Sequence, residues 1–341
     1  MVVTTPTLTS QRWGRDPHHV YDYYANPIRM VGGNPCIIHR HGGGANTGNV
    51  SGIWDSANGE VYYLWNYLSN NASLAQHFDL LSIGSGQRVI LPGPIRSSKV
   101  FILDAIREFQ AGTAEVRRIG KIGFGASNQY KIDPNKCVVA GDSFGGTVAM
   151  LSQLFPPYIG SGGQITHMYR PYASMQFSSQ VRAVVNHIGQ IDARTIAGID
   201  QQAFTNLNGW FGTSGWSGGT NDGGTEFTAF PNDIKAAASV RAYIQNGNTE
   251  YYRPFFNLYN SGFSGGHTHP YTEPHDWAQL TEIYSDLNNA GLLHGKYLYN
   301  PGDLSQAGGT GPRAIAAFMA VYNFIAARIT ENAINSSLPV P

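Results

Sequence analysis

The sequence has few charged residues, two cysteines and no long apolar run. Only 13% of its 341 residues are charged, and its 22 basic residues balance its 22 acidic residues. Ordinary soluble domains carry about 25% charged residues. With no excess of basic residues there is no basis for a nucleic-acid partner, and we expect an uncharged or weakly charged small molecule instead. No stretch of about eighteen consecutive apolar residues occurs, so no membrane span is expected.

The first ten residues, MVVTTPTLTS, lack both the basic start and the apolar segment of a signal peptide. No signal peptide is therefore expected, and the compartment stays undetermined. The low charge, with abundant Gly, Asn, Ser and Tyr, is common among secreted and virion-associated proteins. The length is sufficient for one large core, and a single domain with an insertion fits better than two independent domains.

Ser143 lies at a predicted junction between a strand and a helix. Residues 136–150 read KCVVAGDSFGGTVAM, a β-branched run, then G-x-S-x-G, then small and apolar residues at helical spacing. This pattern predicts a nucleophile elbow, a strained turn that exposes Ser143. Gly141 and Gly145 supply the small neighbours that such a turn requires.

A second glycine-rich motif lies about a hundred residues upstream. Residues 34–44 read NPCIIHRHGGG, a predicted strand that runs into three glycines. Acyl transfer needs backbone N–H donors that point at the developing oxyanion, and glycines present them without side chains in the way. We expect Gly43 and Gly44 to donate from this loop and Phe144 to donate from the elbow. His41 is expected to hold the loop by hydrogen bonds, and Asp142 to anchor the elbow.

Together these motifs resemble the hormone-sensitive-lipase-like branch of the α/β-hydrolase family, whose hallmarks are HGGG followed by GDSxGG. Residues 132–146, IDPNKCVVAGDSFGG, look like that family's approach to its nucleophile. The resemblance implies an α/β-hydrolase fold with a mostly parallel sheet, helices on both faces and an inserted cap or lid. It also implies a serine carboxylesterase that needs no cofactor.

Alternating strand and helix patterns agree with such a sheet. We expect strands at 19–24, 35–40, 78–83 with 88–91, 181–188, 253–259 and 295–299. We expect helices at 99–109, 276–289 and 312–329. We divide the chain into a first core part at 1–192, a cap at 193–250 and a second core part at 251–341. Cys36 and Cys137 would begin neighbouring strands in this fold, and buried free thiols are expected rather than an awkward cross-strand disulfide.

The predicted cap is rich in glycine and aromatic residues. Its centre, residues 208–227, fits no strand or helix of the core. Trp210, Phe211 and Trp216 would line an acyl or alcohol pocket, because binding sites are lined mainly by apolar rings. The alternative is a surface loop whose rings pack on its own glycines.

The base and the acid of the triad depart from the family pattern. Asp303 follows the last strand, where the family has a histidine, and residues 260–276, NSGFSGGHTHPYTEPHD, hold three histidines where the family has an acid. Because chain order is free in a triad, we expect the order Ser, His, Asp, with His269 as the base, His267 as the second choice and Asp303 as the acid. Asp192 is the alternative acid. His275 is the third histidine of the segment.

Three functions stay open on the sequence. A carboxylesterase for small or medium esters fits best. A deacetylase or polyester hydrolase on a polymeric substrate is the second, and a catalytically silent binding protein is the third. A zinc site at His267 and His269 is a further alternative that we do not favour, so no metal is expected.

Overall fold

The computed structural model describes residues 6–14, 19–42, 61–84, 102–155, 177–191, 239–263 and 275–331. Within them, eight strands form one sheet in the order β1-β2-β4-β3-β5-β6-β7-β8. The strands are β1 (Leu8–Arg12), β2 (Val20–Tyr24), β3 (Asn34–Arg40), β4 (Asp79–Gly84), β5 (Ile132–Asp142), β6 (Val184–His187), β7 (Phe255–Asn260) and β8 (His294–Tyr299). β2 pairs antiparallel with β1 and β4, and every pair from β4 to β8 is parallel. The predicted mostly parallel sheet is confirmed.

The central strands are buried on both faces. All seven residues of β3 are buried, and its side chains alternate between two apolar clusters. Cys36 and Ile38 belong to one cluster, and Ile37 belongs to the other. A parallel strand covered on both sides reads as a continuous apolar run rather than as an alternation, which is why residues 35–38 are PCII.

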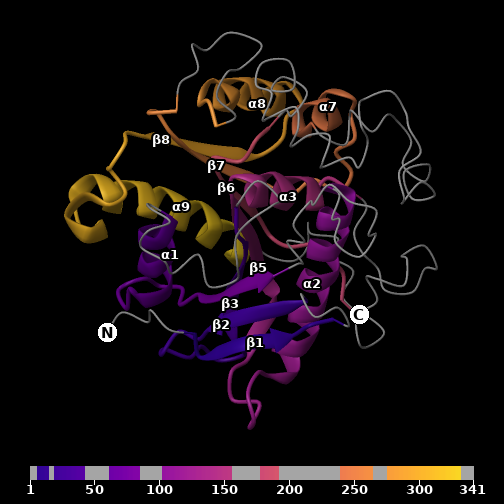
Figure 1. The fold of residues 1–341 in the computed structure, drawn as a ribbon, viewed down its shortest axis with the longest axis vertical. Helices are drawn as coiled ribbons and strands as arrows, with labels where there is room; N and C mark the ends of the chain where they lie inside the picture. The colour runs from indigo at the N-terminus through magenta and orange to yellow at the C-terminus, as the bar shows by residue number, and fades with distance from the viewer. Residues whose placement is uncertain are drawn as a thin grey trace, which may run out of the picture.

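Helices cover both faces of the sheet. They are α1 (Val61–Asn70), α2 (Ile102–Ile122), α3 (Phe144–Ser152), α7 (Val240–Gln245), α8 (Ala278–Asn289) and α9 (Pro312–Thr330), with a short 3-10 helix, η6 (Gln306–Gly309), before α9. Apolar residues of α1 and α9 pack on one face, and those of α2, α3, α7 and α8 pack on the other. Figure 1 shows α1 and α9 together on one side of the sheet and α2 and α3 on the other.

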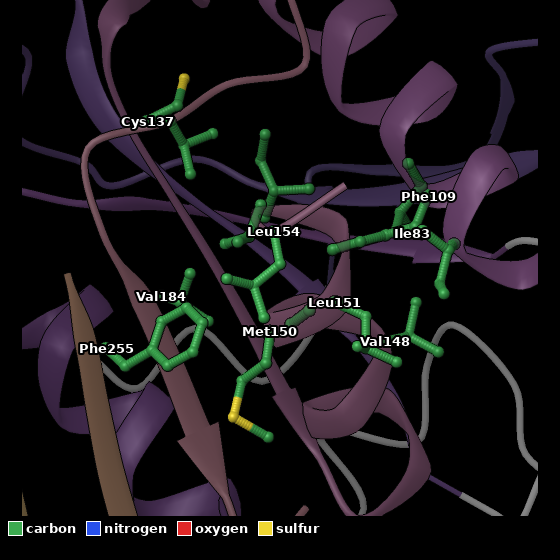
Figure 2. Close-up of a cluster of buried hydrophobic side chains, with 14 of the residues drawn as sticks. Ile83, Phe109, Cys137, Val148, Met150, Leu151, Leu154, Val184 and Phe255 are labelled. Atoms are coloured by element: carbon green, nitrogen blue, oxygen red, sulfur yellow. The ribbon is translucent and has the colours of Figure 1, made fainter. Parts of the chain in front are cut away.

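The elbow helix α3 is held in the centre of the larger cluster. Figure 2 shows Val148 and Leu151 of α3 beside Phe109 of α2 and Ile83 of β4. All nine residues of α3 are buried. Burial of a Val or Leu side chain contributes about 1.5–3 kcal/mol, so the position of α3 on the sheet is strongly fixed. The residue that precedes α3 is therefore held rigidly as well.

Several elements differ from the sequence expectation. The helix expected at 99–109 is α2, which continues to Ile122, and β1 and α1 were not anticipated. The strand expected at 88–91 lies outside the described residues. Both cysteines are buried free thiols, as predicted, and they face each other in the register of β3 and β5. Among the described helices, none is long and apolar enough to cross a membrane.

The predicted cap is described only at its end. Residues 193–238 lie outside the described residues, so a cap over that range stays a prediction. The remaining part includes α7, whose Val240 and Ile244 belong to the apolar cluster on the α3 face. This helix therefore forms part of the layer that covers the sheet.

Candidate active site

Ser143 occupies the strained turn between β5 and α3. Its backbone has φ 49° and ψ −125°, a conformation that non-glycine residues rarely adopt. Its N–H donates to the carbonyl of His187 at 2.9 Å, and its own carbonyl accepts from the N–H of Gly146 at 2.9 Å. The surrounding hydrogen bonds and the packing of α3 hold this turn in place. The predicted strained turn from strand to helix at Ser143 is confirmed.

The glycines of the elbow are required by close backbone contacts. A Cβ on Gly145 would lie 2.2 Å from the carbonyl oxygen of Arg40, and a Cβ on Gly141 would lie 2.3 Å from the carbonyl carbon of Gly145. Both contacts are with backbone atoms, which have little freedom to move. The sequence argument for small residues at these two positions is therefore correct.

A histidine lies within hydrogen-bond reach of the serine hydroxyl. The distance from Ser143 Oγ to His275 Nε2 is 2.8 Å. This is the geometry that a general base needs to take the hydroxyl proton. His267 and His269, the two rings that the sequence analysis favours as the base, lie outside the described residues. The ring that the structure brings to Ser143 is His275, from the same segment.

The local backbone fixes His275 close to the first turn of α8. The N–H of Trp277 donates to the carbonyl of Phe263 at 3.1 Å, which joins the two ends of the segment that carries the three histidines. The Phe263 ring lies against the His275 ring, with centroids 5.4 Å apart. Asp276 is fully buried, and its Oδ1 accepts the N–H of Ala278 at 2.8 Å. These contacts hold the imidazole in place.

The structure does not bring Asp303 to the base. Its Oδ2 accepts from the backbone N–H of Asn300 at 2.9 Å and from the Asn300 amide at 3.2 Å, and its Oδ1 accepts from Arg313 at 3.3 Å. Burial acts to raise the pKa of Asp303, but these hydrogen bonds and the Arg313 cation bring it below its ordinary value. Asp303 therefore closes the turn after β8, and the identity of the acid stays a prediction.

Asp142 ties the elbow to the glycine-rich loop. Its Oδ2 accepts the N–H of Gly42 at 3.0 Å, and its Oδ1 lies 3.2 Å from Nε2 of His39. Burial acts to raise the pKa of Asp142, and the hydrogen bond from His39 is the largest effect that brings it below the ordinary value. The expected anchoring role of this aspartate is confirmed.

His41 holds the start of the same loop. Its Nδ1–H donates to the carbonyl of Gly42 at 2.9 Å. Burial, with the nearby Arg40 cation as a smaller effect, lowers the pKa of His41 to about 4. The imidazole is therefore neutral near pH 7, and its hydrogen bond to Gly42 holds the start of the loop, as expected.

The structure describes one of the three residues predicted to donate to the oxyanion. Gly42 approaches the nucleophile so closely that a Cβ on it would lie 3.1 Å from Cβ of Ser143. Gly43 and Gly44, the next two residues, lie outside the described residues. Phe144 is the first residue of α3, and the first N–H groups of a helix have no acceptor inside it. The beginning of the loop and the beginning of the helix thus meet at Ser143.

His187 lies beside the elbow, although no sequence motif includes it. It is the last residue of β6, and its Nε2 lies 2.6 Å from the hydroxyl of Tyr299, with the two rings nearly parallel. Burial lowers the pKa of His187 to about 4, so its ring is neutral near pH 7. The available signal was its position at the carboxyl end of a strand next to β5, where the sites of parallel sheets lie.

The predicted pocket residues are not described. Trp210, Phe211, Trp216 and the alternative acid Asp192 all lie outside the described residues. In the part of the chain that the structure does describe, no group of three or more His, Cys, Asp or Glu side chains is arranged to hold a metal ion.

Comparisons with known proteins agree with this architecture. No protein-family model matches the sequence, and no curated protein matches it. Among solved structures, esterase B from Lactobacillus rhamnosis is similar over 96% of this chain and 89% of its own, with 13% identity and a TM-score of 0.59. Its form inhibited by a tributyrin phosphonate gives a TM-score of 0.60 over the same shares.

A thermophilic bacterial esterase gives a similar result. Esterase 2 of Thermogutta terrifontis, phosphonylated by sarin, covers 90% of this chain and 89% of its own, at 13% identity and a TM-score of 0.54. The sheet order, the elbow after β5 and these similarities lead to one conclusion. The chain has the α/β-hydrolase fold.

Proposed function

We propose that this protein is a serine carboxylic-ester hydrolase that acts on small or medium uncharged esters through an acyl-enzyme. The distance of 2.8 Å between Ser143 Oγ and His275 Nε2 is the observation that carries the proposal. A serine hydroxyl is too weak an acid to attack an ester without a base in reach. The strained elbow presents the hydroxyl at the point where that base lies.

The reaction has two similar halves. Ser143 Oγ bonds to the ester carbonyl carbon while its proton passes to Nε2 of His275, and the carbonyl π electrons move onto oxygen. The tetrahedral intermediate then collapses, and the alcohol leaves with the proton that His275 returns. Water, activated by the same imidazole, attacks the acyl-enzyme and releases the acid.

The oxyanion is assigned to three backbone donors. The close approach of Gly42 to Ser143 supports donors from the next two residues, Gly43 and Gly44. The N–H of Phe144, at the start of α3, is the third. Loss of a single oxyanion donor costs about 2.7–4 kcal/mol in comparable enzymes. Each of the three is therefore a substantial part of the rate enhancement.

Asp192 is proposed as the group that orients His275. The preceding residue, Ile191, donates its N–H to Oε1 of Gln279 at 2.9 Å. Gln279 lies in the first turn of α8, four residues after His275. This attachment supports a position of Asp192 near the imidazole, and Asp303 is engaged elsewhere.

A pair of conservative variants tests this acid. Asp192→Asn is expected to lower kcat about 10,000-fold, as loss of the orienting carboxylate does in a triad. Asp303→Asn should change kcat by less than about tenfold, because its carboxylate only closes a turn. If kcat fell more in Asp303→Asn than in Asp192→Asn, Asp303 would be the acid of the triad. Thermal unfolding of both proteins is the control for folding.

Hydrolysis and serine labelling test the whole proposal. Esterase B and Esterase 2 are described as inhibited or phosphonylated by phosphonate-type compounds, which supports the use of a fluorophosphonate probe. The wild type is expected to hydrolyse p-nitrophenyl esters of short and medium acyl chains and to be labelled at Ser143. Ser143→Ala should lose both. A folded wild type that does neither is a silent hydrolase-like protein. Acetylated glycans and polyester films in the same assay show whether the ester belongs to a polymer.

A further inference from the structure

Arg40 is a buried cation directly behind the elbow. It is the last residue of β3 and is only 1% exposed. By the alternation of β3, it lies on the same face of the sheet as Ile38, which packs in the cluster covered by α2 and α3. Its carbonyl oxygen is the atom that excludes a side chain at Gly145. Both its backbone and its side chain are therefore part of the elbow's surroundings.

Among the described residues, no carboxylate forms an ion pair with the Arg40 guanidinium. Within the described residues, its Nε and Nη1 have no hydrogen-bond acceptor. The acid that acts on it is Glu108 of α2, which raises its pKa but forms no ion pair with it. Glu108 Oε1 lies 3.3 Å from Nε2 of His19, and Oε2 has no partner among the described residues. Burial lowers the pKa of Arg40 to about 10, so the guanidinium is charged near pH 7.

A buried charge without an ion-pair partner lowers the stability of a fold, so the groups around the Arg40 guanidinium indicate which part of the site it acts on. Such charges destabilise a fold unless they are paired. The Arg40 guanidinium carbon lies over the Phe144 ring, 5.9 Å from its centroid. Phe144 carries the proposed oxyanion donor of the elbow. The Arg40 cation also lowers the pKa of His41, at the start of the glycine-rich loop. Its field therefore reaches both sources of oxyanion donors.

The segment that carries the base reaches Ser143 from the other side of β5. β3 is adjacent to β5 on one side, whereas His275 follows β7 on the other side, and its Nε2 lies 2.8 Å from Ser143 Oγ. A positive charge at the end of β3 is thus on the side of the glycine-rich loop, where we expect it to favour the developing oxyanion. In the attack step a neutral ester becomes an anion, so this charge discriminates between ground state and transition state.

We infer that Arg40 is a positioning residue that keeps a positive potential at the oxyanion, through the Phe144 side of the elbow. The inference rests on the proposed esterase function. When Ser143 Oγ bonds to the carbonyl carbon, the π pair moves to oxygen and the proton moves to His275. Arg40 stabilises the negative oxygen without touching it.

Two substitutions distinguish the effect of the Arg40 charge from the effect of its shape. Arg40→Met removes the charge and keeps the length, and Arg40→Lys keeps the charge. A unit charge within about 10 Å of a developing charge, at an effective dielectric constant of about 20, changes the rate by about an order of magnitude. We expect Arg40→Met to lower kcat about tenfold with KM unchanged, and Arg40→Lys to stay within about threefold of the wild type.

Inhibitor binding shows whether Arg40→Met acts by removing a positive potential or by displacing the backbone of the elbow. An alkyl boronic acid binds as a tetrahedral anion on Ser143, whereas an amide of the same chain length binds uncharged. Arg40→Met should weaken the binding of the boronic acid by the same factor by which kcat falls, and it should leave the binding of the amide unchanged. Equal weakening of both ligands, or a kcat equal to that of the wild type, would overturn the inference. Wild-type protein that is not labelled by fluorophosphonate would instead refute the esterase proposal itself.

Two further variants protect the test against misfolding. Glu108→Gln removes the acid that offsets Arg40, so kcat should rise or stay level, and a fall parallel to that of Arg40→Met would contradict the field. Arg117→Met is the matched control, because Arg117 is also buried but donates to the carbonyls of Pro134, Ser178 and Gln180. It should lower the melting temperature and leave kcat per titrated site unchanged.

Discussion

Replacing His275 by glutamine tests the reacting pair directly. Glutamine keeps a polar side chain of similar length, so packing beside Phe263 is largely retained while the titratable ring is lost. In the wild type, Nε2 lies 2.8 Å from Ser143 Oγ, which is close enough to take the proton without rearrangement. Loss of a triad base leaves only the catalysis that binding and the oxyanion donors supply. We therefore expect kcat to fall about a million-fold, equivalent to about 8 kcal/mol of transition-state stabilisation.

The assay is initial-rate hydrolysis of a p-nitrophenyl ester, together with the rate of fluorophosphonate labelling. Both should fall, because both require an activated Ser143. The matched control is His294→Gln: His294 contacts Tyr284 and the carbonyl of Leu292, away from the serine. Its activity should stay within about threefold of the wild type. If His275→Gln retains more than a tenth of wild-type activity while His269→Gln does not, the base is the other histidine and our reading of the pair is wrong.

Three other measurements follow from buried groups. Burial raises the pKa of Cys36 and Cys137, that of Cys137 to about 12, so a thiol reagent at pH 8 should react with neither in the native protein and with both after unfolding. The pKa values of His41 and His187 are about 4 in the folded protein and 6.5 in free histidine, so the unfolded chain binds more protons between pH 4 and pH 6.5. The free energy of unfolding, measured in a denaturation series, should therefore fall by a few kcal/mol as the pH drops from about 6.5 to about 4. A free energy that does not change with pH would contradict the burial of both rings. Gly145→Ala would place a methyl carbon against two backbone carbonyls of the adjoining strand end, so soluble protein should lose esterase activity and melt at a lower temperature; a normal melting temperature would show that the elbow can relax.

The motifs that the sequence identifies are those in which backbone geometry restricts residue type. Ser143 is recognisable because its positive φ requires small neighbours, and Gly145 has no room for a side chain. The same logic identified the glycine-rich loop. The alternation of strand and helix patterns, together with the family resemblance, predicted the mostly parallel sheet. Burial on both faces explains the continuous apolar runs of its central strands.

The partners of the serine could not be assigned in the same way. His267, His269 and His275 lie in one short segment, and no local rule ranks three imidazoles that are delivered by a loop. An aspartate after a strand is equally typical of a catalytic acid and of a turn, and the NPGD sequence that ends at Asp303 is a turn signal. Only tertiary contacts, here Asn300 and Arg313, distinguish the two.

The clasp between Trp277 and Phe263 has a consequence for engineering. Since the N–H of one residue meets the carbonyl of the other at 3.1 Å, the chain leaves and re-enters the scaffold at nearly one point. Doubling the length of a closed loop costs only about 0.6 kcal/mol. Libraries of different length and composition between residues 264 and 274 are therefore a way to vary substrate preference, with His275, which lies inside the closed loop beside Phe263, kept unchanged.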